Sequence, residues 1–258
     1  MRWLAWGFAI AALGPLACVG DDSTGVDSGA PDAAAETAPA GFCATHTSAT
    51  TLLCADFDGP SLDAGWTDTV VVGGGALSLE STDAVSAPNA LVAKLPSSAT
   101  PTSAMLRLDP VGAPAAFSGA LRLEVKVPAC FQGNDLLTIA SLQFFASSTI
   151  TYQIDLQISV NGSVAIFVQN EAESGINGQQ FGANQLLPLN AWTDMELDLT
   201  TSGTPHANLV QGGQVVLSAD LLPGTASGAP RFLLGASADK LTSATCSVEL
   251  DDVTLDRQ

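Results

Sequence analysis

From Phe42 onward, hydrophobic and polar residues alternate with a period of two, the pattern of β-strands that bury one face. In Leu121–Val127 the apolar side chains share one face and the charged ones the other. Thr151–Val160 behaves in the same way, and Asn161-Gly162 then reads as a hairpin turn into Ser163–Gln169. These segments predict a hairpin within a larger antiparallel sheet.

The same alternation recurs along the rest of the chain, and no stretch shows a helical period. Further predicted strands are Leu52–Phe57, Ala76–Glu80, Ala90–Leu95, Ala104–Asp109, Leu136–Phe145, Asp194–Thr200, Gln214–Ala219, Arg231–Ala236 and Cys246–Leu255. Short strands in this number, separated by Gly and Pro, predict an all-β fold of two packed antiparallel sheets. Hydrophobic residues make up 47% of the chain, which is enough for a sizeable core.

The N-terminus has the layout of a bacterial lipoprotein signal peptide. After a basic start, Leu4–Leu13 is an uncharged apolar run, too short to span a bilayer and typical of a signal-peptide hydrophobic region. The small residue before Cys18 resembles the lipobox, in which the cysteine is diacylated and becomes the new N-terminus. The lipobox has Leu near the third position before the cysteine, where this chain has Pro15, with Leu16 one place closer.

An ordinary secretory peptide is the alternative, but it needs small residues one and three places before the cut, and Pro15-Leu16-Ala17 fails this test. Residues 19–40 contain five acids and neither a base nor an aromatic residue, so they should form a disordered tether. The predicted organisation is a signal peptide at 1–17, a lipidated Cys18 with its tether at 18–41, and a β-sandwich at 42–258.

The charge balance narrows the possible partners. The chain has 26 Asp and Glu against 8 Lys and Arg, for a formal charge of −18. Nucleic acid is not an expected partner, because its affinity comes largely from Lys and Arg that displace counterions, and anionic lipid would be repelled too. The acidity favours solubility in an extracellular space, with a cation-binding role as the alternative.

Five cysteines leave one unpaired in an oxidising compartment, and lipidation of Cys18 removes that one. The four others, Cys43, Cys54, Cys130 and Cys246, allow three pairings. We favour Cys43–Cys54, which closes a small loop at the domain entry, and Cys130–Cys246, which ties the middle of the domain to its last strand. Four free thiols, the alternative, are uncommon outside the cytoplasm.

Four local patterns, in this order, resemble the concanavalin A-like lectin/glucanase jelly roll, which includes laminin-G-like domains. They are Cys54-Ala55-Asp56-Phe57-Asp58-Gly59 with Trp66, Ser86–Leu91, Leu187–Trp192 leading into Met195–Leu199, and Glu249–Val253. The resemblance covers residues 52–256 and implies a curved sandwich with a concave sheet. In many members of the family it also implies a carbohydrate site or a structural calcium ion.

The residues of a catalytic site are harder to find. Glycosidases of this fold carry a Glu-x-Asp-x-(x)-Glu strand that supplies two facing carboxyl groups. Glu196–Thr201 and Glu249–Asp252 come nearest, and both lack the second glutamate. His46 and His206 lie far apart without metal-ligand spacing, and we interpret them as loop histidines.

We therefore expect a non-catalytic module that binds a glycan or a protein partner. The alternatives are a glycoside hydrolase or lyase whose carboxylates come from distant strands, and a structural envelope protein. The candidate ligand surface is the polar strand face of Gln153, Asp155 and Gln157, together with the loop Asn170–Asn184, which is rich in Gln, Asn and Gly. Sugar sites usually also need an exposed aromatic; the Trp and Tyr residues of the domain are Trp66, Trp192 and Tyr152, and we expect Trp192 and Tyr152 in the core.

Four acids at the two ends of the domain suggest a structural calcium ion. Asp56 and Asp58 share a strand face, and Asp251 and Asp252 lie where the apolar phase slips by one residue, as at a β-bulge. First and last strands often neighbour each other in this fold, so the two pairs could converge. Calcium binds six to eight oxygens, so backbone carbonyls would have to contribute; ordinary solvated carboxylates are the alternative.

The lipobox generates a first testable prediction. Val19, in place of Asp directly after the cysteine, resembles outer-membrane sorting in Gram-negative bacteria and implies a lipid-anchored protein of the cell envelope. Cys18→Ala should therefore release the protein from the membrane fraction or leave its precursor uncut, as immunoblots of fractionated cells would show. A variant that matures and sediments with membranes like the wild type would rule out the anchor.

Overall fold

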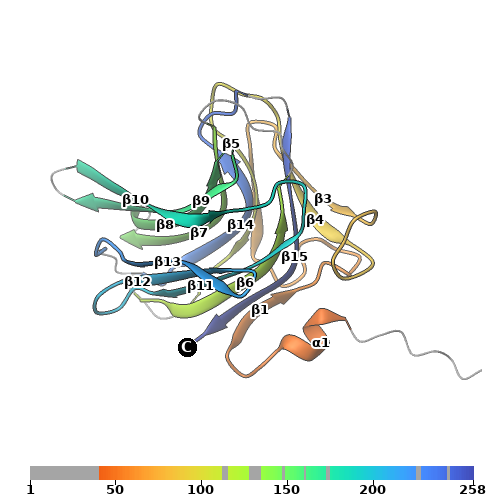
Figure 1. Ribbon diagram of the computed structural model, residues 1–258, viewed down its shortest axis with the longest axis horizontal. Helices are drawn as coiled ribbons and strands as arrows, with labels where there is room; N and C mark the ends of the chain where they lie inside the picture. Colours follow the sequence, from red (N-terminus) through yellow and green to blue (C-terminus); the bar gives the residue numbers. More distant parts are fainter. Residues whose placement is uncertain are drawn as a thin grey trace, which may run out of the picture. The chain divides into compact units, whose positions relative to one another are not determined.

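Strands pair into two antiparallel sheets in the computed structural model (Figure 1), which describes residues 41–111, 116–127, 135–146, 149–159, 161–172, 175–224, 228–242 and 245–258. The first sheet contains, in spatial order, β13 (Gln214–Asp220), β12 (His206–Gln211), β11 (Thr193–Thr200), β6 (Ser118–Lys126), β15 (Cys246–Arg257), β4 (Ala90–Leu95) and β3 (Ala76–Glu80), and β1 (Thr51–Ala55) also pairs with β15. The second contains β10 (Gly175–Leu186), β9 (Ser163–Ala172), β8 (Thr149–Ser159), β7 (Leu136–Ala146), β14 (Arg231–Ala238), β5 (Thr102–Leu108) and β2 (Asp68–Val72). The predicted all-β jelly-roll sandwich is confirmed.

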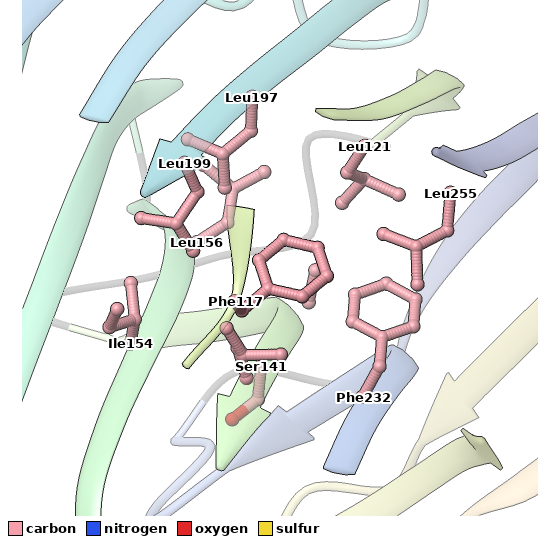
Figure 2. Close-up of a pocket in the computed structure, with 11 residues that line it drawn as sticks. Phe117, Leu121, Ser141, Ile154, Leu156, Leu197, Leu199, Phe232 and Leu255 are labelled. Carbon is pink, nitrogen blue, oxygen red and sulfur yellow. The ribbon is translucent and has the colours of Figure 1, made fainter. Parts of the chain in front are cut away.

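The core lies between the facing sides of the two sheets. Figure 2 shows its middle, where Leu197 and Leu199 of β11 approach Ile154 and Leu156 of β8 around the ring of Phe117. The space left between these side chains is about 20 Å³ and is lined almost entirely by apolar groups. It has room for about one water molecule, so this interior space is a packing defect and not a ligand site.

Three strands and one helix are absent from the sequence-based prediction. β2 and β10 are edge strands of the second sheet and β12 lies inside the first, whereas α1 (Phe42–His46) precedes β1. β10 carries mainly Gly, Asn and Gln, and the exposed residues 177–180 show no alternation in burial. Phe181 and Ala183 of β10 pack against the core but stay half-buried. This apolar stripe is too short to predict a strand, and the predicted loop Asn170–Asn184 is in fact largely the β9–β10 hairpin.

The chain ends of the domain meet as predicted. β1 pairs with β15, with Cys54 opposite Thr254. A disulfide joins Cys43 of α1 to Cys54 of β1, in agreement with the favoured pairing. Cys246 is fully buried, and its expected partner Cys130 lies outside the described residues, so that pairing stays a prediction. Cys18 and the predicted tether also lie outside the described residues.

The predicted bulge in the last strand is present. The pairing of β15 with β6 shifts register between Asp251 and Thr254, and Asp252 adopts a φ of 49°. No helix in the described segments is long and apolar enough to cross a membrane.

The packing of β8 generates a second prediction. Leu156 is 1% exposed and lines the centre of the core, so Leu156→Ala should lower the free energy of unfolding by about 2–5 kcal/mol. Val215 on the edge strand β13 is 65% exposed, and Val215→Ala should cost less than about 1 kcal/mol. Urea unfolding followed by tryptophan fluorescence measures both; equal losses would contradict this assignment of the core.

Candidate functional site

One row of residues crosses the second sheet on the face that points away from the core. Residues directly opposite each other in paired strands share a face of the sheet. The register therefore aligns Gln180, Phe167, Asp155, Ser141, Leu233, Arg107 and Asp68, one from each strand in spatial order. An aromatic ring, an acid and a cation thus lie on one continuous surface.

The burial of one face of β8 determines which of its side chains point to this surface. Ile154, Leu156 and Ile158 are buried between the sheets. Since successive side chains of a strand point to opposite faces, Gln153, Asp155 and Gln157 point outward. These are the three residues that the sequence analysis selected, and the structure places them side by side in one groove.

This groove, here called the Asp155 groove, has a volume of about 430 Å³, within the usual size range of ligand sites. Its floor is formed by β7 and β8, one wall by β9 and the other by the end of β14. The polar and aromatic residues that line it are Thr138, Gln153, Asp155, Gln157, Phe167, Gln169, Ser237, Asp239 and Lys240. It is therefore lined mainly by amide, hydroxyl and carboxyl groups.

A β-bulge in β7 shapes the floor. Thr138 pairs with Gln157, and Ser141 pairs with Asp155, so three residue steps on β7 match two steps on β8. In a regular strand, residues three apart point to opposite faces. The extra residue between Thr138 and Ser141 brings both of them to the face of the groove.

Asp155 is the central ionisable group of the groove. It is only 5% exposed, and the Gln153 amide donates hydrogen bonds to both of its carboxyl oxygens, at 2.9 and 2.8 Å. The pKa of Asp155 is raised to about 6, mainly by burial; the negative charge of Asp239 contributes to the rise, and hydrogen bonds with Ser141 and Gln153 oppose it. A carboxyl group with such a pKa can both donate and accept a proton near neutral pH.

Phe167 supplies an aromatic surface that the prediction from the sequence did not include. It lies directly opposite Asp155 on β9 and is half-buried. Gly178 on β10 leaves room for its ring, because a Cβ atom there would lie 2.9 Å from the ring atom Cζ. The alternation of Val164, Ile166 and Val168 into the core already placed Phe167 on the outer face, so the signal was present in the sequence.

Asp239 and Lys240 are also new members of the site. Both are exposed and follow the last residues of β14. No sequence motif marks them, because only the pairing of β14 with β7 brings them beside β8.

Trp192, expected in the core, is instead half-buried, and its indole N–H donates a hydrogen bond to Asp83 at 3.0 Å. Tyr152 is buried, as expected.

The four acids of the predicted calcium site do come close together, but they have protein partners. Asp251 is fully buried and accepts hydrogen bonds from the backbone N–H groups of Val85 and Ser86, at 2.9 and 3.0 Å. Asp252 accepts one from the Ser86 hydroxyl at 2.7 Å. These acids therefore hold the loop before β4 against the last strand.

The other two acids bind backbone groups as well. Asp56 accepts a hydrogen bond from Cys43 N–H, and Asp58 accepts one from Asn89 N–H, each at 3.3 Å. Burial raises the pKa of Asp58, and the charges of Asp56 and Asp252 add to the shift. Within the described ranges, no group of three or more His, Cys, Asp or Glu side chains is arranged to hold a metal ion. The calcium ion stays a prediction.

The two histidines lie in secondary structure and not in loops. His46 ends α1, where its ring stacks on Phe42 with 4.0 Å between the ring centroids. His206 begins β12 and bonds to Asp220 at 2.8 Å. Neither residue lines the Asp155 groove.

Comparison with known proteins identifies the fold and not the family. No protein-family model matches the sequence, and no curated protein is significantly similar to it. Among solved structures, an endo-β-1,4-glucuronan lyase from the fungus Trichoderma reesei is similar with a TM-score of 0.62 and 12% identity, over 75% of this chain and 92% of the lyase. The protein named "Cellulose induced protein, Cip1" has a TM-score of 0.57 and 14% identity, over 80% of this chain and 97% of that one.

A glycoside hydrolase family 16 endo-glucanase from Bacteroides ovatus is also similar, with a TM-score of 0.57 and 11% identity, over 79% of this chain and 99% of the enzyme. At this level of identity the likeness shows a shared jelly-roll fold and carries no activity to this chain.

Asp155 generates a third prediction, on stability and pH. Its folded-state pKa of about 6 exceeds the value of about 3.9 for an unfolded aspartate. The folded state therefore binds more protons between these values, and the free energy of unfolding falls as the pH rises from about 4 to about 7. The difference between the two pKa values corresponds to a loss of unfolding free energy on the order of 3 kcal/mol. Asp155→Asn should not show this loss.

Urea unfolding of both proteins across this pH range measures the effect. Burial also raises the pKa of Asp251, to about 7, but that contribution occurs in both proteins and cancels in their difference. The difference should grow in favour of Asp155→Asn and level off above about pH 7. Ser237→Ala, a change without charge in the same groove, should show a constant difference, and a constant difference for Asp155→Asn would refute the raised pKa.

Proposed function

We propose that this domain binds a polysaccharide along the Asp155 groove and hydrolyses it, with Asp155 as the proton donor. The observation that carries the proposal is a buried carboxyl group with a raised pKa on the floor of a polar groove that a second carboxyl group also lines. The shared fold of the glycan-active enzymes named above supports it.

The groove has the groups that sugar binding requires. The amides of Gln153, Gln157 and Gln169 can donate to and accept from sugar hydroxyls. Phe167 offers one face of an aromatic ring, on which the apolar side of a pyranose can pack. Because Gln153 is already bonded to Asp155, the two side chains are held in place before a ligand arrives.

The second carboxyl group distinguishes cleavage from simple binding. Glycoside hydrolysis uses one carboxylic acid to protonate the glycosidic oxygen and one carboxylate to activate water or attack the sugar. Asp155 would give its proton to the leaving oxygen as the bond to the anomeric carbon breaks. The Asp239 carboxylate, in the wall of the same groove, would take a proton from the water that attacks that carbon. Solvent then restores both protonation states.

The sequence favours a non-catalytic module, because no strand carries a second carboxyl group beside the first. The proposed pair instead comes from β8 and from the residue directly after β14, so the proposal follows the alternative of a site assembled from distant strands. A lipid on Cys18, if present, would hold this groove at the cell envelope.

A fourth prediction tests binding and cleavage separately, with the purified full chain and a panel of polysaccharides. Phe167→Ala should weaken binding by about tenfold, the scale of one lost ring contact. Asp155→Asn should slow the release of reducing ends by about 100-fold or more and leave binding within about threefold of the wild type. Glu80→Gln, on β3 of the other sheet, should change neither measurement.

Three results would each contradict a different part of the proposal. Binding without any cleavage by the wild type would leave a glycan-binding module and overturn the catalytic role of Asp155 and Asp239. Cleavage that survives in Asp155→Asn would overturn the role of Asp155 alone. A wild-type chain that binds no glycan in the panel would overturn the whole proposal.

A further inference from the structure

The ionic groups on the outer face of the second sheet are largely paired with one another. Arg107 forms ion pairs with Asp68 at 3.2 Å and with Asp109 at 3.5 Å. Arg231 pairs with the second oxygen of Asp109 at 3.1 Å, and its guanidinium group lies over the ring of Phe145, 4.6 Å from the centroid. A ligand carboxylate would have to displace these partners to reach either arginine.

The Asp155 groove itself carries no excess of positive charge. Asp155 and Asp239 line it together with one cation, Lys240, so the net charge of these three groups is zero when Asp155 is protonated and negative when Asp155 is ionised. Within the described ranges, no carboxylate lies within ion-pair distance of Lys240. The protein as a whole carries a formal charge of −18, which adds a repulsive field for any polyanion.

From this distribution we infer that the substrate of the Asp155 groove is a neutral polysaccharide and not a polyuronate. The inference rests on the proposed function and adds the substrate class to it. A uronate polymer carries a carboxylate on every sugar, so consecutive sugars would bring several negative charges into a groove that is lined, among the described residues, by one cation, Lys240. A neutral sugar needs only the hydroxyl, amide and aromatic contacts that the groove already provides.

Electrostatics sets the size of the expected preference. Two like charges that lie a few ångströms apart near a protein surface repel each other, and salt reduces this repulsion. We therefore expect neutral oligosaccharides to bind at least about tenfold more tightly than uronates of the same linkage. Their binding should also change little with ionic strength.

Matched ligand pairs test the inference by calorimetry or affinity electrophoresis with the full chain. Each pair has one linkage and one stereochemistry and differs only at C6, as in cello-oligosaccharides against β-1,4-oligoglucuronates, or manno-oligosaccharides against oligomannuronates. Preference for the neutral member of every pair that binds supports the inference. Equal or stronger binding of the uronate overturns it but leaves the proposed function standing, whereas no binding to any member overturns the proposed function itself.

A charge-reversal variant tests the cause of the preference. Asp239→Lys should strengthen uronate binding by about threefold to tenfold at low salt and lose this gain at high salt. The matched control is Asp220→Lys, which makes the same change in total charge on the exposed edge strand β13 of the other sheet. If both variants strengthen uronate binding equally, the total charge and not the groove decides the preference, and the inference fails.

Discussion

The period-two alternation of β8 is the constraint on which the rest of the site depends. Ile154, Leu156 and Ile158 are buried against the first sheet, so the residues between them must face outward. A shift of β8 by one residue would bury Asp155 and its neighbours in an apolar core, at a large cost in desolvation. The hydrophobic core therefore fixes the position of the polar groove on the opposite face of β8.

Low exposure gives Asp155 its chemical character. A carboxylate at the surface is ionised at neutral pH, but this one is nearly covered by its neighbours and held by the Gln153 amide. Removing water destabilises the charged form more than the hydrogen bonds restore it, so the pKa of Asp155 rises to about 6. Asp251, which is covered by the loop before β4, shows the same effect without any groove, so a raised pKa alone does not identify a site.

The two acid-rich regions of the domain differ in what their carboxylates bind. Near the chain ends, Asp56, Asp58 and Asp251 accept hydrogen bonds from backbone N–H groups and connect α1, β15 and the loop before β4. In the Asp155 groove, Asp239 is exposed at a wall and leaves its charge available. The first arrangement stabilises the fold, and the second leaves polar groups free for a ligand.

Local patterns in the sequence were enough for the fold class, most strands, the pairing of Cys43 with Cys54 and the outward face of Gln153, Asp155 and Gln157. All of these follow from alternation or from short loops, which depend on neighbours in the chain. The sequence alone could not show the edge strand β10, whose apolar stripe is short and only half-buried, or the approach of Asp239 and Lys240 to β8. These depend on pairing between strands far apart in the chain and on a bulge in β7. Such contacts are decided by the packing of two whole sheets, and no local pattern of residues encodes them.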